Sequence, residues 1–248
     1  MEIVNLFPRF RNGALVTETS AIHAFDLAEA TKHLAERDDC LRLLIEETLP
    51  FQIDVADAQS PYEALLESIA YQSISGKAAA TIFARIKALG KNGRPPTPRE
   101  MLNLRPQKLR KAGLSGAKVL AMKDLAQKTI DGVVPTMEEA QKMSDEELVE
   151  RLVSVRGIGA WTVEMFLIFR LGRPDVLPIH DLGVKKGWSV TYGKKRMPKP
   201  KELLAFGERW RPYRTVASWY MWRAFERAGY KATNKISKAR NRSKKTPG

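Results

Sequence analysis

The stretch SDEELVERLVSVRGIGAWTVEMFLIFRLGRPDVLPIHDLGVKKG, residues 144–187, decides how this chain folds. Ser144 and Glu147 have the S-x-x-E spacing of a capping box, in which two side chains satisfy backbone N–H groups at a helix start. A helix is therefore predicted to begin at this point. The glycines of residues 156–159 then interrupt the helical pattern and predict a tight turn. From Ala160 an apolar run predicts a second, mostly buried helix.

The turn between these helices is a candidate phosphate-binding element. Gly157, Ile158, Gly159 and Ala160 lead into the second helix, where backbone N–H groups lie at the positive end of the helix dipole. A phosphate oxygen can approach such groups without meeting a side chain and without regard to base sequence. Many ordinary helical hairpins also carry glycine, so the turn alone favours a structural role. The residues that follow change that balance.

After the second helix, a proline-stiffened loop delivers Asp181 to the start of another helical segment. The motif V-R-G-I-G-A-W-T at 155–162, followed by L-P-I-H-D-L-G-V at 177–184, resembles the helix-hairpin-helix DNA glycosylase superfamily. The motif of that superfamily ends in one catalytic aspartate, which here would be Asp181. From the residues alone, Asp181 could instead only cap the next helix. The adjacent His180 is expected to be structural rather than a general base.

Two features narrow the resemblance to one branch. Bifunctional members, which also cut the sugar–phosphate backbone, carry a lysine two residues after the second hairpin glycine, where this chain has Trp161. Members with an iron–sulfur cluster need several cysteines after the motif, whereas the only cysteine here is Cys40. The chain therefore resembles the monofunctional, AlkA-like 3-methyladenine DNA glycosylase II family. This resemblance implies an all-α, two-lobed helical fold with the active-site cleft between the lobes.

The composition agrees with a soluble nucleic-acid-binding protein. The 248 residues, 44% of them apolar, suffice for one large or two modest domains, and the formal net charge of +14 predicts a polyanionic partner. A membrane partner is not expected, because Arg156, Glu164 and Arg170 interrupt the longest apolar stretch. With no secretory signal at Met1, the expected location is the cytoplasm, with the nucleoid, in a prokaryote, or the nucleus in a eukaryote.

Three parts are predicted along the chain. Residues 1–20 have no helical period and are expected to form an extended arm, and the strongly basic residues 231–248 are expected to form a disordered tail. Between them, residues 21–230 are expected to form the glycosylase domain, with the hairpin motif at 144–171 and the catalytic loop at 174–184.

Two further stretches supply candidate DNA contacts. Residues 72–80 resemble a bend that faces the minor groove in the family, where some relatives place a bulky wedge residue. The matching position is near Ser75, which is small and could equally be a helix cap. Residues 111–118 repeat the pattern of small residues and a lysine at a helix start. The candidate DNA-binding residues are Gly157, Ile158, Gly159, Ala160, Gln72, Ser75, Gly76, Lys77, Gly116 and Lys118.

An aromatic helix near the C-terminus forms the third block of the resemblance. The preceding W-R-P-Y-R motif leads into a helix that, in relatives, packs beside the catalytic motif. Trp219 and Tyr220 are expected to lie in the core. Trp222 matches a base-pocket aromatic of the family, and with Trp161 and Met165 it is expected to form an apolar pocket. Its aromatic faces would attract positively charged methylated bases.

The resemblance implies a monofunctional DNA glycosylase that flips alkylated bases, 3-methyladenine and 7-methylguanine, out of duplex DNA and hydrolyses the N-glycosidic bond. It is expected to act as a monomer without an organic cofactor. In relatives, hairpin carbonyls hold a monovalent cation, Na⁺ or K⁺, and here these would belong to Val153, Val155 and Ile158. The alternatives are a glycosylase for etheno, deaminated or oxidised bases, and a non-catalytic DNA-binding protein. Asp181 disfavours the last, because an acid near phosphates weakens binding.

Overall fold

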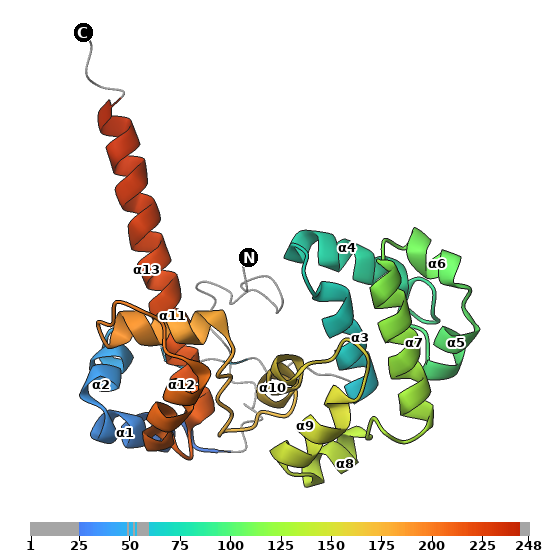
Figure 1. Ribbon diagram of the computed structural model, residues 1–248, viewed down its shortest axis with the longest axis horizontal. Coiled ribbons are helices and arrows are strands. Elements are labelled where there is room, and N and C mark those ends of the chain that lie inside the picture. Colours follow the sequence, from blue (N-terminus) through green and yellow to red (C-terminus); the bar gives the residue numbers. More distant parts are fainter. Residues whose placement is uncertain (1–24, 49, 52, 54–59, 244–248) are drawn as a thin grey trace. The chain divides into compact units, whose positions relative to one another are not determined.

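The computed structural model describes residues 25–48, 50, 51, 53 and 60–243. No β-strand occurs among these residues, so the predicted all-α class is confirmed (Figure 1). The expected N-terminal arm, residues 1–20, lies outside the described residues. In chain order the helices are α1 (Leu27–Arg37), α2 (Asp39–Glu46), α3 (Pro61–Tyr71), α4 (Gly76–Lys87), α5 (Pro98–Asn103), α6 (Pro106–Lys111), α7 (Gly116–Ile130), α8 (Met137–Lys142), α9 (Asp145–Val153), α10 (Ala160–Phe169), α11 (Leu182–Thr191), α12 (Pro200–Gly207), η2 (Glu208–Trp210) and α13 (Arg214–Ser243).

The helices gather into two compact units. The first contains α3 to α10, within residues 60–172, and the second contains α1, α2 and the helices from α11 onward, within residues 25–53 and 173–243. Among the described residues, the chain runs from the second unit into the first and back into the second. The predicted cleft between two lobes stays a prediction.

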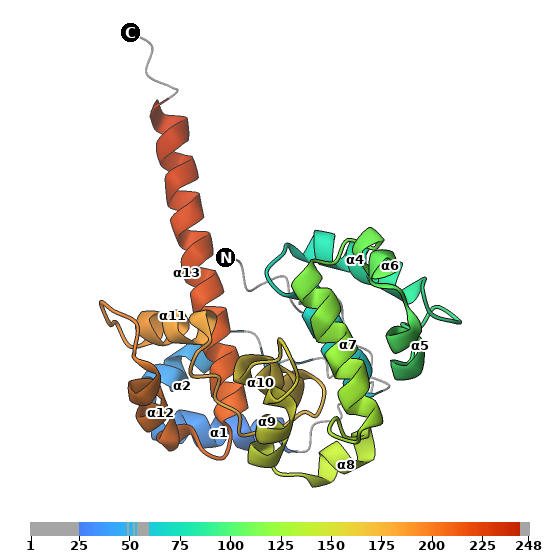
Figure 2. The same ribbon diagram turned by 45° about the vertical axis from the view of Figure 1, so that its right-hand side comes forward.

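Helix α7 is the central element of the first unit. It packs against α3, α5 and α6, and Figure 2 shows it as the long green helix among them. Its contact with α3 is apolar, because Ile69 of α3 and both Met122 and Leu125 of α7 are fully buried. Ser115 caps its N-terminus by accepting a hydrogen bond from the backbone of Lys118.

In the second unit, α11 packs closely along α13. A Cβ atom on Gly187 would lie 1.9 Å from the backbone oxygen of Met221, so the two helices can approach this closely only because residue 187 is glycine. Trp219 and Tyr220 of α13 are buried, as predicted for core residues. This packing brings the first half of α13 beside the start of α11.

A buried carboxylate joins three elements of the second unit. Asp38 accepts hydrogen bonds from the backbone N–H of Leu41, at 3.0 Å, and from the hydroxyl of Tyr192, at 2.6 Å. The indole N–H of Trp210 donates to the same carboxylate at 3.4 Å. Burial, together with this carboxylate, raises the pKa of Tyr192 and keeps its phenol protonated. Asp38 therefore connects α2 to the end of α11 and to η2.

The last helix, α13, reaches into the basic C-terminal segment. Residues 231–248 were expected to form a disordered tail, and α13 runs into this segment as far as Ser243, so the start of the tail stays a prediction. The segment from 231 to 243 contains no glycine or proline, and five of its thirteen residues are lysine or arginine, which are good helix formers. The remaining residues, 244–248, lie outside the described part of the chain.

Candidate active site

The hairpin begins as the capping motif predicted. The backbone N–H of Ser144 donates to the carboxylate of Glu147 at 2.9 Å, and the backbone N–H of Glu147 donates to the Ser144 hydroxyl at 3.2 Å. These hydrogen bonds lower the pKa of Glu147. Helix α9 follows, and α10 starts at Ala160 as predicted and ends at Phe169.

The turn between α9 and α10 exposes its backbone. Gly157 has a φ of 78°, a left-handed conformation that glycine adopts without strain. Ile158 is buried, while Gly157, Gly159 and Ala160 are exposed. No side chain caps α10, and a Cβ atom built on Gly159 would have no neighbour within 4 Å. The first turn of α10 is thus open to an anion, as a phosphate-binding helix start requires.

Two charged side chains of α7 form hydrogen bonds with the backbone of this turn. The Asp124 carboxylate accepts a hydrogen bond from the backbone N–H of Arg156 at 2.7 Å, and the Lys128 ammonium donates to the carbonyl of Ser154. Asp124 and Lys128 also form an ion pair at 3.1 Å. Sequence analysis did not identify this support, because the residues that provide it lie far from the hairpin in the chain.

The carbonyls expected to hold a monovalent cation lie in the same turn. The Val155 carbonyl accepts a hydrogen bond from the Ile158 N–H at 3.0 Å, and a carbonyl oxygen keeps a second lone pair. The carbonyls of Val153 and Ile158 complete the expected set. Neutral oxygen donors of this kind fit a hard monovalent cation, although the Lys128 ammonium already occupies the neighbouring carbonyl of Ser154.

Asp181 lies at the start of α11 in the second unit. Its side chain is only 2% exposed, and its Oδ1 atom accepts two hydrogen bonds. One comes from the backbone N–H of Val184 at 2.8 Å, which makes Asp181 the N-cap of α11, as the capping alternative proposed. The other comes from the indole N–H of Trp222 at 2.9 Å. Two donors on one oxygen fix the plane of this carboxylate.

A glycine makes room for the indole beside Asp181. A Cβ atom on Gly183 would lie 2.7 Å from Cδ1 of Trp222 and 3.1 Å from Oδ1 of Asp181. Any larger residue at position 183 would therefore displace the indole or the carboxylate. Sequence analysis matched Trp222 to a base-pocket aromatic but did not anticipate its hydrogen bond to Asp181 or the need for Gly183.

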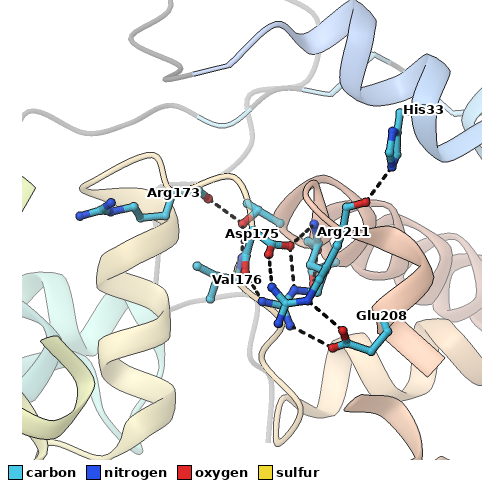
Figure 3. Close-up of polar contacts among 9 residues, drawn as sticks. His33, Arg173, Asp175, Val176, Glu208 and Arg211 are labelled. Atoms are coloured by element: carbon cyan, nitrogen blue, oxygen red, sulfur yellow. Dashed lines mark hydrogen bonds and ion pairs between the residues drawn. The ribbon is translucent and has the colours of Figure 1, made fainter. Parts of the chain in front are cut away.

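An ion cluster anchors the loop that leads to Asp181 (Figure 3). Asp175 accepts hydrogen bonds from the Arg211 guanidinium at 2.6 Å and from Nε of Arg214 at 2.7 Å. Arg211 also pairs with Glu208 at 2.9 Å. We call Asp175, Arg211 and Arg214 the Asp175 clamp. Both arginines belong to the C-terminal block of the family resemblance, which was expected to pack beside the catalytic motif.

Backbone contacts reinforce the Asp175 clamp. The Thr215 hydroxyl donates to the carbonyl of Arg173 at 2.6 Å and accepts from the N–H of Val176 at 3.0 Å. The carbonyl of Arg211 lies 2.7 Å from Nε2 of His33, so α1 contacts the same region (Figure 3). The start of the loop is thereby held on both sides.

The other residues predicted for the base pocket lie in the first unit. Trp161 is half-buried and Met165 is buried, and their spacing of four residues puts them on one face of α10. Trp222 is half-buried in the second unit. A pocket that contains all three stays a prediction. His180 is exposed beside Asp181.

The residues predicted to contact DNA at the bend between α3 and α4 and at the start of α7 make different contacts in the structure. Ser75 caps α4, so the capping alternative for this residue is confirmed. The Gln72 side-chain amide donates to the carbonyl of Gly157 at 2.9 Å, which joins the bend to the hairpin. The Lys118 ammonium, predicted to contact DNA, donates to the backbone carbonyls of Ala70 and Gln72. The remaining predicted positions around these two helix starts are Gly76, which is half-buried, and Lys77 and Gly116, which are exposed.

The family model and the relatives that match this chain point to the same superfamily. Residues 66–212 match the family model of the HhH-GPD superfamily base excision DNA repair proteins. The chain is 38% identical over 205 residues to DNA-3-methyladenine glycosylase 1 of Schizosaccharomyces pombe, a match that covers 82% of this chain and 90% of the relative. None of the described helices is long and apolar enough to cross a membrane.

Solved structures of two relatives have the same fold. The S. pombe 3-methyladenine DNA glycosylase in complex with abasic DNA has a TM-score of 0.71 at 38% identity, covering 78% of this chain and 95% of that chain. A DNA-3-methyladenine glycosidase from Bacillus halodurans has a TM-score of 0.72 at 32% identity, with 79% and 88% covered.

Proposed function

The chain belongs to the HhH-GPD superfamily of base excision DNA repair proteins, and from this premise we infer that it is a DNA glycosylase. It excises alkylated bases, 3-methyladenine and 7-methylguanine, from DNA. It is an N-glycosyl hydrolase of the 3-methyladenine glycosylase type and leaves the sugar–phosphate backbone intact, because Trp161 stands where bifunctional members have a lysine nucleophile.

One observation carries this proposal, namely the buried and oriented carboxylate of Asp181. A residue that only capped a helix would not need to be buried. A buried carboxylate that is held by Val184 and Trp222 acts strongly on a nearby charge, because little water screens it. The chemistry that benefits is the breaking of an N-glycosidic bond, in which positive charge develops on the sugar.

The reaction begins with extrusion of the damaged nucleotide. A base within the duplex cannot reach a buried carboxylate, so the nucleotide must rotate out of the stack, which costs a few kcal/mol, less for a damaged base. We propose that Trp161, Met165 and Trp222 receive the extruded base. Methylation at N3 of adenine or N7 of guanine makes the base cationic, and aromatic faces attract a cation more than the neutral parent base.

Asp181 then acts on the sugar rather than on the base. A cationic base leaves without first being protonated, so no strong general acid is needed. The carboxylate of Asp181 stabilises the oxocarbenium-like sugar and positions or deprotonates the attacking water. The hydrogen bond from the Trp222 indole keeps the carboxylate aimed while charge develops.

The DNA backbone is bound by exposed main chain. We propose that the turn from Gly157 to Ala160 binds phosphates through backbone N–H groups, with further contacts from the helix starts at Gly76 and Gly116. The net charge of +14 favours binding to the phosphates of duplex DNA. We propose that the chain binds as a monomer and acts in the compartment that holds the genome. A monovalent cation on the carbonyls of Val153, Val155 and Ile158 would stiffen the turn.

The test is release of free bases from methylated duplex DNA by the wild-type chain and Asp181→Asn, followed by alkali to reveal abasic sites. The proposal predicts 3-methyladenine and 7-methylguanine in the wild-type reaction, and strand breaks only after alkali. Release of neither base by a wild-type chain that binds duplex DNA would contradict it, as would equal release by the variant.

A further inference from the structure

Three lysines of α7 each contact the C-terminal end of a different neighbouring helix. Lys118 donates to the last carbonyls of α3, Lys123 to carbonyls at the end of α5, and Lys128 to the carbonyl of Ser154 after α9. Carbonyls at a helix C-terminus have no partners within the helix and carry partial negative charge, so an ammonium group stabilises them. These lysines therefore serve the fold, even though a basic chain suggests that its lysines bind DNA.

Lys118 differs from the other two because of what it holds. Its ammonium lies 2.8 Å from the carbonyl of Ala70 and 2.7 Å from the carbonyl of Gln72. Gln72 is the first residue of a sharp bend in which Ser73 has a φ of 59°, an unfavourable conformation for a residue with a side chain. Ser73 and Ser75 are exposed at the tip of this bend. Burial lowers the pKa of Lys118.

The same bend is linked to the hairpin. The Gln72 side chain donates to the carbonyl of Gly157 at 2.9 Å. Arg156, which precedes Gly157 in the hairpin, donates its backbone N–H to the Asp124 carboxylate of α7. The contacts therefore close a ring that starts and ends on α7, through Lys118, Gln72, Gly157, Arg156 and Asp124. We call this set the α7 ring.

We propose that Lys118 is a positioning residue, which acts through the α7 ring to hold the Gln72–Ser75 bend at a fixed distance from the Gly157–Ala160 turn. The inference rests on the proposed function. Both elements present exposed backbone and small residues, and under the proposed function both contact DNA. Extrusion of a paired nucleotide needs both contacts in place at once, and misplacement of one by about 1 Å can lower a rate considerably.

Lys118→Met removes the ammonium and keeps most of the side-chain volume. Lys123→Met is a matched control, because Lys123 makes the same kind of contact, 2.8 Å to the carbonyls of both Leu102 and Leu104, but lies outside the α7 ring. Asp124→Ala opens the ring at its other end and serves as the second test if Lys118→Met fails to fold. Thermal unfolding of all three variants measures the loss of stability separately.

The experiment measures single-turnover base release from two duplexes that share one strand with a single 7-methylguanine. In one duplex the lesion is opposite cytosine, and in the other it is opposite a stable abasic-site analogue, so that no base pair must be broken. A positioning role predicts that Lys118→Met slows release from the paired duplex about tenfold and from the unpaired duplex much less. Lys123→Met should release base at the wild-type rate from both.

Two results would overturn the inference while leaving the proposed function intact. One is an active wild-type chain with equal rates for Lys118→Met and Lys123→Met. The other is a defect of Lys118→Met that is the same on both duplexes, which would indicate general loss of structure. A wild-type chain that releases no base from either duplex would overturn the proposed function and the inference together.

Discussion

The hairpin turn of the first unit and the Asp181 loop of the second are built by opposite means. The turn presents exposed backbone, with Gly157, Gly159 and Ala160 at its surface and no side-chain cap on α10. The loop presents one buried side chain, Asp181, fixed by donors from α11 and α13. Exposed backbone suits a phosphate chain of any sequence, whereas a buried, oriented carboxylate suits one chemical step.

This difference implies that DNA affinity and chemistry can be changed separately. Substitutions in the turn should alter the dissociation constant and leave the rate at saturation unchanged. Substitutions in the loop should do the reverse.

The largest effect is expected for Asp181→Asn. An asparagine oxygen can still accept from Val184 and Trp222, so the fold of the loop should persist while the negative charge is lost. The single-turnover rate of base release should fall by about 10³-fold or more, and duplex affinity should change little. Gel-shift titration and quenched-flow release on the same duplex measure the two quantities. A variant that loses affinity as much as rate would break the comparison.

Gly159→Asp should have the opposite effect. The added side chain has open space, and aspartate is a favourable N-cap, so α10 should not be destabilised. Its negative charge would repel the phosphate at the first turn of the helix. We expect duplex affinity to weaken by about 10- to 50-fold, with an unchanged rate at saturating protein. Gly159→Ala, which adds no charge, is the control and should bind like the wild-type chain.

Gly183→Ala should reduce the rate without removing the carboxylate. Its Cβ would lie 2.7 Å from Trp222, so the indole should shift and its hydrogen bond to Asp181 should weaken. The rate should fall about tenfold at unchanged affinity. Trp222→Phe, which removes the N–H donor and keeps a smaller aromatic ring, should lower the rate similarly. The double variant should be little slower than either alone, and fully additive losses would contradict this link.

The smallest effect on catalysis is expected from opening the Asp175 clamp. Asp175→Asn weakens ion pairs with Arg211 and Arg214, of which Arg214 is only 12% exposed. The free energy of unfolding should decrease by about 2 kcal/mol, with a modest loss of rate. Glu202→Gln, which breaks the exposed pair with Arg196, should have a smaller effect on the melting temperature. Equal losses in the two variants would show that burial of the clamp does not matter.

Local signals in the sequence predicted the hairpin well. Its helix starts and its glycine turn follow from capping, periodicity and backbone freedom within a short segment. The location of Asp181 was predicted by resemblance, and its capping role by its position. These features depend on neighbours in the sequence, so a sequence contains them.

Long-range contacts could not be predicted in the same way. Lys118 follows a helix start and has the charge of a DNA contact, but its ammonium reaches carbonyls on α3 because α7 packs there. Asp175 is separated along the chain from Arg211 and Arg214 by α11, α12 and η2.

The most direct test of the separation between affinity and chemistry is one time course of base release from a methylated duplex, with protein in excess. Wild type, Gly159→Asp and Asp181→Asn are each measured far below and far above their dissociation constants. The account predicts that high protein concentration restores Gly159→Asp to the wild-type rate and leaves Asp181→Asn without detectable release. Release by Asp181→Asn at the wild-type rate, or a Gly159→Asp rate that no concentration restores, would contradict it.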